Sequence, residues 1–260
     1  MGSLLPEQIL QETVEKGAAK AQGSMQALSI LGFLGGMYIS LGYLAYIRVV
    51  GGMPHDWGSL AVFIGSAVFP IGLICILIGG GELITGNMMV LPVAWLAKRI
   101  SLAQWGRNWL IVTLANLVGA FFVAWFFGHY VGLTEGAVLA KTVSAAEGKV
   151  AEDFGRALVS GIGCNWMVCM GVWLCYGARS FSGKVLGIWF PVMIFVLAGF
   201  QHVVANMFVI PAAIWAGADI SWAQFGRNMV SVYIGNAIGG AVFVGALYFY
   251  AYRGKLQAGG

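Results

Sequence analysis

The side chains that could do chemistry gather in two short stretches of an otherwise apolar chain. The first stretch reads GGGELITGN (79–87) and the second reads GFQHVVAN (199–206). Their polar residues include Glu82, Thr85, Gln201, His202 and Asn206. The imidazole of a histidine titrates near neutral pH, so His202 can exchange a proton or a hydrogen bond with a small solute. We therefore expect the two stretches to meet such a solute.

The composition indicates that a lipid bilayer surrounds these residues. The 260 residues are 60% hydrophobic and 9% charged, with a mean hydropathy of +0.85, whereas a soluble domain carries about 25% charged residues. The net charge of +4 comes from residues at the ends of apolar segments, which excludes a nucleic-acid-binding patch. The cysteines lie inside apolar segments without zinc or disulfide spacing, and we expect no metal site: Cys75, Cys164, Cys169 and Cys175.

The elements that must position the polar residues are membrane-spanning helices. A bilayer core about 30 Å thick needs about 20 apolar helical residues. The sequence predicts an all-α membrane protein with six spans: 27–50, 59–79, 107–128, 156–178, 186–200 and 228–252. Two shorter apolar stretches, 88–97 and 207–216, would cross half of the bilayer. Residues 1–26 are predicted to form a cytoplasmic amphipathic helix, residues 27–252 one six-span domain, and residues 253–260 a cytoplasmic tail.

The basic residues predict the orientation of the spans in an inner or plasma membrane. Nine lysines and arginines would share a side with the two termini, and five would face the other side. Because the side richer in lysine and arginine is usually cytoplasmic, both termini are predicted to be cytoplasmic.

The two halves of the chain resemble each other. SLAQWGRNWLIVTLANLVGA (101–120) aligns with SWAQFGRNMVSVYIGNAIGG (221–240) at nine identical positions of twenty. Upstream, GNMMVLPVAWLA (86–97) aligns with ANMFVIPAAIWA (205–216). Each half holds three crossings, an odd number, so the sequence predicts an inverted 3+3 repeat. Inverted repeats with interrupted helices at matching places indicate a transport site near the midplane.

The two polar stretches are predicted to break the second and fifth helices. Non-helical backbone is tolerated at membrane depth only where it is buried in protein or lines a wet cavity. We expect Asn87 and Asn206 to be the N-cap residues of two half-helices, whose free N–H groups favour an anion. Pro92 and Pro211 follow five residues later, so each half-helix either starts later or is kinked.

Several polar residues allow a structural role as well as a functional one. His202 could instead bond the opposite loop, and Glu82 could pin the glycine-rich loop without meeting a solute. Thr85 could contribute a hydroxyl to the pathway or cap the loop. Asn165, in GCNWMVCM, is expected to face a pathway or a partner helix rather than lipid.

At these residues the sequence resembles the formate/nitrite transporter family. The resemblance rests on GELITGN (81–87), GKVAEDFGRALVSGIGCNWMVC (148–169) and above all GFQHVVANMF (199–208), and it extends along the whole chain. It implies an aquaporin-like protomer in a homopentamer, each protomer with its own pore and without a cofactor. It also implies transport of formate, nitrite, hydrosulfide or short monocarboxylates; the last motif favours formate.

The resemblance also implies roles for individual residues. His202 corresponds to the central pore histidine, Thr85 to the loop threonine, Asn165 to the asparagine facing that loop, and Lys149 to the basic residue of the outer approach. Narrow apolar rings would be formed toward the cytoplasm by Phe69, Leu73 and Phe195, and toward the outside by Leu83, Ile84 and Val168. Many relatives have Glu in place of Gln201 and an aromatic residue in place of Ile84, so selectivity stays open.

These expectations lead to a mechanism. Moving a bare anion through an apolar ring costs at least several kcal/mol, while neutralising a small carboxylate at pH 7 costs about 3 pH units, or ~4 kcal/mol. Passage of a small carboxylate as its neutral acid is therefore competitive with passage of the bare anion. We expect Lys149 to attract the anion and His202 to give it a proton or only a hydrogen bond. The N-terminal helix would either cap the cytoplasmic mouth or only pack against its neighbours.

Three other classes of protein are disfavoured. In a neutral-solute channel of the aquaporin type both half-helices should open with Asn-Pro-Ala, but Asn87 and Asn206 precede methionines. An intramembrane enzyme using Glu82 and His202 would need a further polar partner or a metal cluster. A scaffolding protein would not need matched polar breaks. The sequence therefore predicts an anion transporter and no enzyme.

Overall fold

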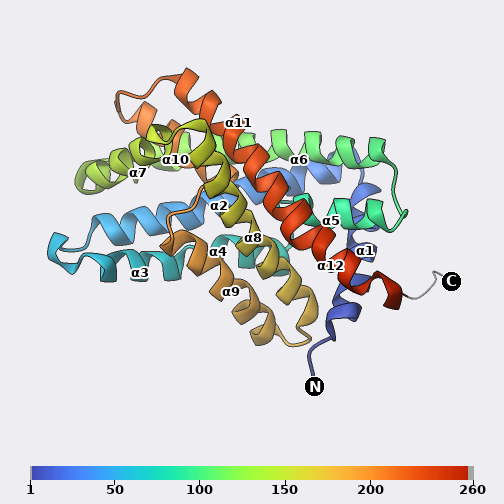
Figure 1. The fold of residues 1–260 in the computed structure, drawn as a ribbon. Helices are drawn as coiled ribbons and strands as arrows, with labels where there is room; N and C mark the ends of the chain where they lie inside the picture. The colour runs from blue at the N-terminus through green and yellow to red at the C-terminus, as the bar shows by residue number, and fades with distance from the viewer. Residues whose placement is uncertain (1, 257–260) are drawn as a thin grey trace.

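The computed structural model describes residues 2–256, and all regular structure in that part of the chain is helical (Figure 1). The first half contains α1 (Pro6–Ala21), α2 (Met25–Gly51), η1 (His55–Trp57), α3 (Ser59–Val68), α4 (Ile71–Ile74), η2 (Cys75–Gly80), α5 (Ile84–Leu96), α6 (Leu102–Phe122) and η3 (Val123–Tyr130). The second half contains η4 (Gly136–Val138), α7 (Leu139–Ala151), α8 (Phe154–Gly177), α9 (Phe181–Leu197), α10 (Val203–Trp215), α11 (Trp222–Ile238), η5 (Gly239–Ala246), α12 (Leu247–Tyr252) and η6 (Arg253–Lys255).

Five continuous helices of the described residues are long and apolar enough to cross a membrane: Met25–Gly51, Ser59–Gly80, Leu102–Tyr130, Phe154–Gly177 and Trp222–Lys255. The fifth predicted span, 186–200, corresponds to α9, an apolar helix of 17 residues. It begins earlier than predicted because the Ser180 hydroxyl accepts a hydrogen bond from the backbone of Gly183. A helix of this length measures about 26 Å, near the lower limit for a span.

Helices α6 and α11 have the same design. Each begins with a capping box, formed by Ser101 with Gln104 and by Ser221 with Gln224. Each continues into a π-helical segment, η3 and η5 respectively. The identity between 101–120 and 221–240 therefore extends to local structure.

The two shorter helices, α5 and α10, lie inside the protein. Every residue from 84 to 94 and from 203 to 213 is buried. Figure 1 shows α1 beside α5 toward one end of the molecule and α7 beside α10 toward the other. Each short helix thus has an amphipathic helix packed against it.

Glycines let the long helices approach the interruptions closely. A Cβ atom on Gly35 of α2 would collide with the carbonyl oxygen of Glu82, and one on Gly36 would collide with the carbonyl oxygen of Asn116. In the second half, Gly235 of α11 packs against the carbonyl oxygen of Leu158 in the same way. These contacts bring α2 against α6 and α8 against α11.

Candidate functional site

The first interruption lies between η2 and α5. Gly80 has a φ angle of 108°, and residues 81–83 are not helical. Asn116 of α6 bonds the backbone on both sides of this gap. Its Oδ1 atom accepts the N–H of Ile84 (2.9 Å), while Nδ2 donates to the carbonyl oxygens of Glu82 (2.8 Å) and Gly32 (2.7 Å). One amide therefore satisfies backbone groups that the missing turn leaves free.

The second interruption lies between α9 and α10, and it has the same bonding pattern. Gly199 has a φ angle of 76°. Asn236 of α11 accepts the N–H of Val203 at Oδ1 (2.9 Å) and donates from Nδ2 to the carbonyl oxygens of Gln201 (3.0 Å) and Gly161 (2.8 Å). The two gaps are thus bridged by asparagines at equivalent positions of the sequence repeat.

The asparagines expected at the N-caps lie one turn inside the helices. The N-cap residues are Leu83 and His202, so the N-cap assignment of Asn87 and Asn206 is wrong. Both amides instead bond back to the gap and across to the next helix. Asn87 donates to Glu82 (2.8 Å) and to Asn108 Oδ1 (2.9 Å). Asn206 donates to the Oε1 atom of Gln201 (2.6 Å) and to Oδ1 of its helix-α11 partner, Asn228 (2.9 Å).

Because the helices start early, Pro92 and Pro211 lie inside them. The half-helices therefore do not start later than Asn87 and Asn206, and the alternative of a later start is wrong.

A lysine approaches each interruption from the adjacent amphipathic helix. Lys20, at the end of α1, forms an ion pair of 2.6 Å with Glu82, and both side chains are largely buried. Lys149 of α7 donates instead to two backbone carbonyls, those of Gly199 (3.0 Å) and Phe200 (3.1 Å). Burial lowers the pKa of Lys149. The lysine of the first interruption is therefore paired with a carboxylate, which also accepts a hydrogen bond from Asn87, whereas the lysine of the second bonds only backbone carbonyls.

His202 and Thr85 connect the two interruptions. The Nε2 atom of His202 lies 3.0 Å from Oγ1 of Thr85, and both residues are buried. The other ring nitrogen, Nδ1, accepts the backbone N–H of Ala205 (3.1 Å). A ring nitrogen accepts only when it carries no proton, so this geometry places the hydrogen of the neutral ring on Nε2. His202 then donates toward Thr85.

Asn165 of α8 holds the Thr85 backbone in place. Its Nδ2 atom donates to the carbonyl oxygens of Thr85 (3.1 Å) and Asn236 (2.7 Å). The Sγ atom of Cys169 lies 3.4 Å from the same Thr85 carbonyl. Asn165 thus bonds α5 to α11 and faces partner helices.

Four cavities follow one another through the molecule. A cavity of about 240 Å³ lies beside Lys149 and reaches His202. It shares Phe69, Phe195 and His202 with a gap that has no room for a water molecule. That gap shares Leu73 and Leu83 with a cavity of about 10 Å³ beside Lys20.

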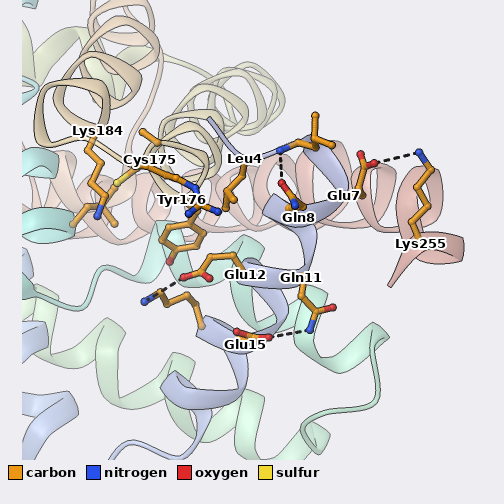
Figure 2. A pocket seen from close by; sticks show the side chains of 15 residues that line it. Leu4, Glu7, Gln8, Gln11, Glu12, Glu15, Cys175, Tyr176, Lys184 and Lys255 are labelled. Carbon is orange, nitrogen blue, oxygen red and sulfur yellow. Dashed lines mark hydrogen bonds and ion pairs between the residues drawn. The ribbon is translucent and has the colours of Figure 1, made fainter. Parts of the chain in front are cut away.

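The last cavity, of about 1010 Å³, is open and shares Leu77 and Tyr176 with the small cavity beside Lys20. Figure 2 shows it between α1 and the end of α8, with Glu12 and Lys184 among its lining residues. The N-terminal helix therefore contributes side chains to this opening in addition to packing against α5.

The apolar rings are distributed differently from the expectation. Phe69 and Phe195 line the cavity that contains Lys149, whereas Leu73 and Leu83 line the one that contains Lys20. The expected grouping of Leu73 with Phe69 and Phe195 therefore differs from the structure, in which Leu73 shares a cavity with Leu83. The reason is that the helix from Ser59 to Gly80 runs toward the Lys20 side, so Phe69 lies one turn before Leu73.

The remaining ring residues have different positions. Val168 lines the dry gap between the two cavities. Ile84 is fully buried, lines none of the four cavities, and is held through its N–H by Asn116.

Comparison with known proteins identifies the family. The family model described as "Formate/nitrite transporter" matches residues 7–250. The chain belongs to the formate/nitrite transporter family. It is therefore an integral membrane protein of a channel and transporter class rather than an enzyme class.

Relatives and solved structures of the formate/nitrite transporter family match nearly the full length. The formate channel BtFdhC of Bacillus thuringiensis is 55% identical over 95% of this chain and 95% of its own. An "FNT family ion channel" structure superposes with a TM-score of 0.88 at 26% identity, covering 94% of this chain and 98% of that one. A structure described as "Pentameric formate channel with formate bound" gives a TM-score of 0.76 at 29% identity, covering 88% and 98%.

For this member of the formate/nitrite transporter family, sequence reasoning missed most of the polar scaffold. It did not select Lys20 or four of the asparagines, which are Asn108, Asn116, Asn228 and Asn236. A signal was present, because these four asparagines occupy identical positions in the aligned repeat. All seven asparagines of the chain are buried and take part in the bonding around the two gaps.

Proposed function

We propose that this protein passes formate, or a related small monovalent anion, through a pore in each protomer of a homopentamer. The route is the line of four cavities from the Lys149 side to the opening beside α1. Relatives described as a formate channel and as a pentameric formate channel support both the substrate and the assembly. The hydrogen bond between His202 and Thr85 at the dry gap is the observation that carries the proposal.

The proposed protomer has six spans, with α9 as the fifth, arranged as an inverted 3+3 repeat. The second and fifth spans are broken at residues 81–83 and 198–202. Residues 1–26 would precede and residues 253–260 would follow one channel domain, 27–252, with both ends in the cytoplasm; of these, residues 1 and 257–260 lie outside the described part of the chain. The two asparagine bridges support the repeat, and the ion pair between Lys255 and Glu7 (3.3 Å) supports a common side for the two ends of the described chain.

Lys149 concentrates the anion in the 240 Å³ cavity, and the apolar gap then removes its water. Phe69, Phe195 and Leu83 line this gap, together with His202. Stripping water from an anion costs several kcal/mol unless another donor replaces it. His202 is the side chain in the gap that can supply such a donor at this point.

His202 acts as a hydrogen-bond donor through Nε2. To give up a full proton it would have to start as an imidazolium, whose Nδ1–H cannot accept the bond from Ala205. The neutral ring retains that helix-capping bond and still offers Nε2–H to the anion in place of Thr85. Thr85 then stabilises the ring orientation between passages.

The test is formate flux into proteoliposomes at several pH values. His202→Asn keeps an N-cap residue type but removes the ring, so flux should fall at least tenfold. His129→Asn is the matched control, because His129 contacts Glu135 and lines none of the four cavities. The proposal is wrong if His202→Asn retains the wild-type rate, and a lower rate with an altered pH dependence would indicate proton transfer in place of a hydrogen bond.

The same vesicles identify the substrate class. Formate, nitrite, hydrosulfide and glycerol are compared side by side, and formate should permeate fastest. Faster nitrite or hydrosulfide flux would reassign the main substrate. Glycerol flux above that of all anions would instead indicate a neutral-solute channel.

A further inference from the structure

The cavity beside Lys149 contains a tyrosine hydroxyl with no role so far. Tyr43 of α2 lines this cavity and is 9% exposed. Its ring packs edge-on against Tyr46 and Phe69, with centroid distances of 5.6 and 5.8 Å. Within residues 2–256 the hydroxyl of Tyr233 has a hydrogen-bond partner, Thr113, whereas that of Tyr43 has none. The hydroxyl is not one of the fully enclosed polar atoms that lack a partner, so it is accessible from the cavity and free to bond a molecule there.

The Lys149 ammonium group in the same cavity also has a donor to spare. An ammonium carries three N–H groups, and two of them bond the carbonyls of Gly199 and Phe200. Lys141 and Glu152 line the cavity as well, and the Lys141 ammonium lies 5.5 Å from the ring centre of Tyr46. Two cations and one carboxylate therefore face the cavity, which favours an anion.

We propose that the Tyr43 hydroxyl and the Lys149 ammonium group form an anion-binding station at the entrance to the dry gap, with Tyr43 selecting for anions that accept a hydrogen bond. This inference rests on the proposed function. A carboxylate or nitrite fits because it has two oxygen atoms, one for the phenol O–H and one for the ammonium N–H. Tyr43 is in this way a substrate-binding residue.

The size and position of the cavity suit this role. A water molecule takes about 30 Å³ in the liquid, so 240 Å³ holds a formate ion together with part of its hydration shell. The ring of Phe69 packs against that of Tyr43. It also packs against the ring of Phe195 at the gap, with 5.5 Å between the ring centroids of Phe69 and Phe195. An anion that exchanges water for the Tyr43 hydroxyl is therefore already beside the constriction.

Tyr43→Phe tests the station because it keeps the ring and removes only the hydroxyl. Formate flux is measured over a range of formate concentrations in proteoliposomes. The half-saturating concentration should rise about tenfold, as expected for losing one hydrogen bond to a charged ligand, while the maximal rate changes less than twofold. Tyr233→Phe is the matched control and should behave as wild type. Equal half-saturation in Tyr43→Phe and wild type overturns the inference.

A second measurement guards against a folding defect in the variant. Crystals of the wild-type protein are soaked in bromide, a monovalent anion with an anomalous signal. A bromide peak within about 3.5 Å of the Tyr43 hydroxyl supports the station, and a peak in the cavity only elsewhere overturns it. Absence of formate flux in the wild type would instead contradict the proposed function, so the two failures are distinguishable.

Discussion

The two interruptions are built alike but carry different charges. Asn116 and Asn236 bridge the gaps with the same three hydrogen bonds, and Asn87 and Asn206 bond back to the residue before each N-cap. At the first gap that residue is Glu82, which neutralises Lys20. At the second it is Gln201, an amide, and it leaves the charge of Lys149 without a carboxylate bonded to it.

This difference indicates that the backbone geometry of each gap and the net charge beside it are determined by different residues. Amides hold the backbone at both gaps, whereas a single exchange of a carboxylate for an amide decides whether the neighbouring lysine is neutralised. The first gap is therefore a neutral structural clamp. The second gap combines the same clamp with a positive field on the cavity.

The strongest test of the shared geometry is to remove each bridge. Asn116→Leu and Asn236→Leu each eliminate three hydrogen bonds to buried backbone groups, so each should lower the free energy of unfolding by about 3 kcal/mol or more. Thermal denaturation in detergent, followed by tryptophan fluorescence, measures this. The two variants serve as controls for each other, and destabilisation of only one would show that the gaps are held differently.

The next effect comes from making the first gap chemically like the second. Glu82→Gln leaves the largely buried Lys20 ammonium without its carboxylate, which should cost about 2 kcal/mol of stability. Lys20→Met together with Glu82→Gln should recover much of this loss. A double variant as unstable as the single one would contradict the neutral clamp.

The reverse exchange should alter transport, and it also costs stability because the Nε2 atom of the buried Gln201 donates to the carbonyl oxygen of Lys149 (3.2 Å). Gln201→Glu adds a carboxylate near Lys149, so the half-saturating formate concentration should rise roughly fivefold, equivalent to about 1 kcal/mol of opposing charge. Gln224→Glu changes the net charge equally within the capping box of α11 and is the matched control. If both variants shift flux alike, the effect is one of total charge and not of the gap.

The smallest expected effect is the pH dependence of anion capture. Because burial lowers the pKa of Lys149, its charge is lost at a lower pH than that of an exposed lysine. Half-saturating formate should therefore rise as the pH increases from 7 to 9 in the wild type. Lys149→Arg stays charged throughout this range, and its half-saturation should not change. A parallel rise in both proteins would exclude Lys149 as the titrating group.

Sequence reasoning predicted breaks at the two polar stretches because their residues conflict with a helix in lipid. Consecutive glycines before Glu82, and Gln201 beside His202, mark both places directly. The start of each half-helix was misplaced because asparagine is a common N-cap residue, and local preference favoured it over Leu83. Leu83 is the N-cap because the asparagine of α6 holds the Ile84 N–H, and no local rule contains that tertiary bond.

The side of each constriction was also beyond local reasoning. Phe69 and Leu73 are one helical turn apart, and only the packing of α3 and α9 decides which of them meets the Lys149 cavity. In contrast, His202 and Thr85 were each selected as candidates, His202 because ionisable side chains at membrane depth are few and Thr85 because its hydroxyl lies beside the first gap. The structure brings these two residues within hydrogen-bonding distance.

The burial of α5 and α10 dictates an order of events during biosynthesis. Helix α5 packs against α1 and against η5, which is synthesised about 150 residues later, while α10 packs against α2, α6 and η3 from the first half. Neither short helix has the length to insert into a bilayer by itself. Helix α5 can therefore pack against α1 early, but its contacts with η5 form only after the last span has been synthesised. Neither half of the chain can complete its fold alone, and two separately expressed halves would reach the native state only by assembling with each other.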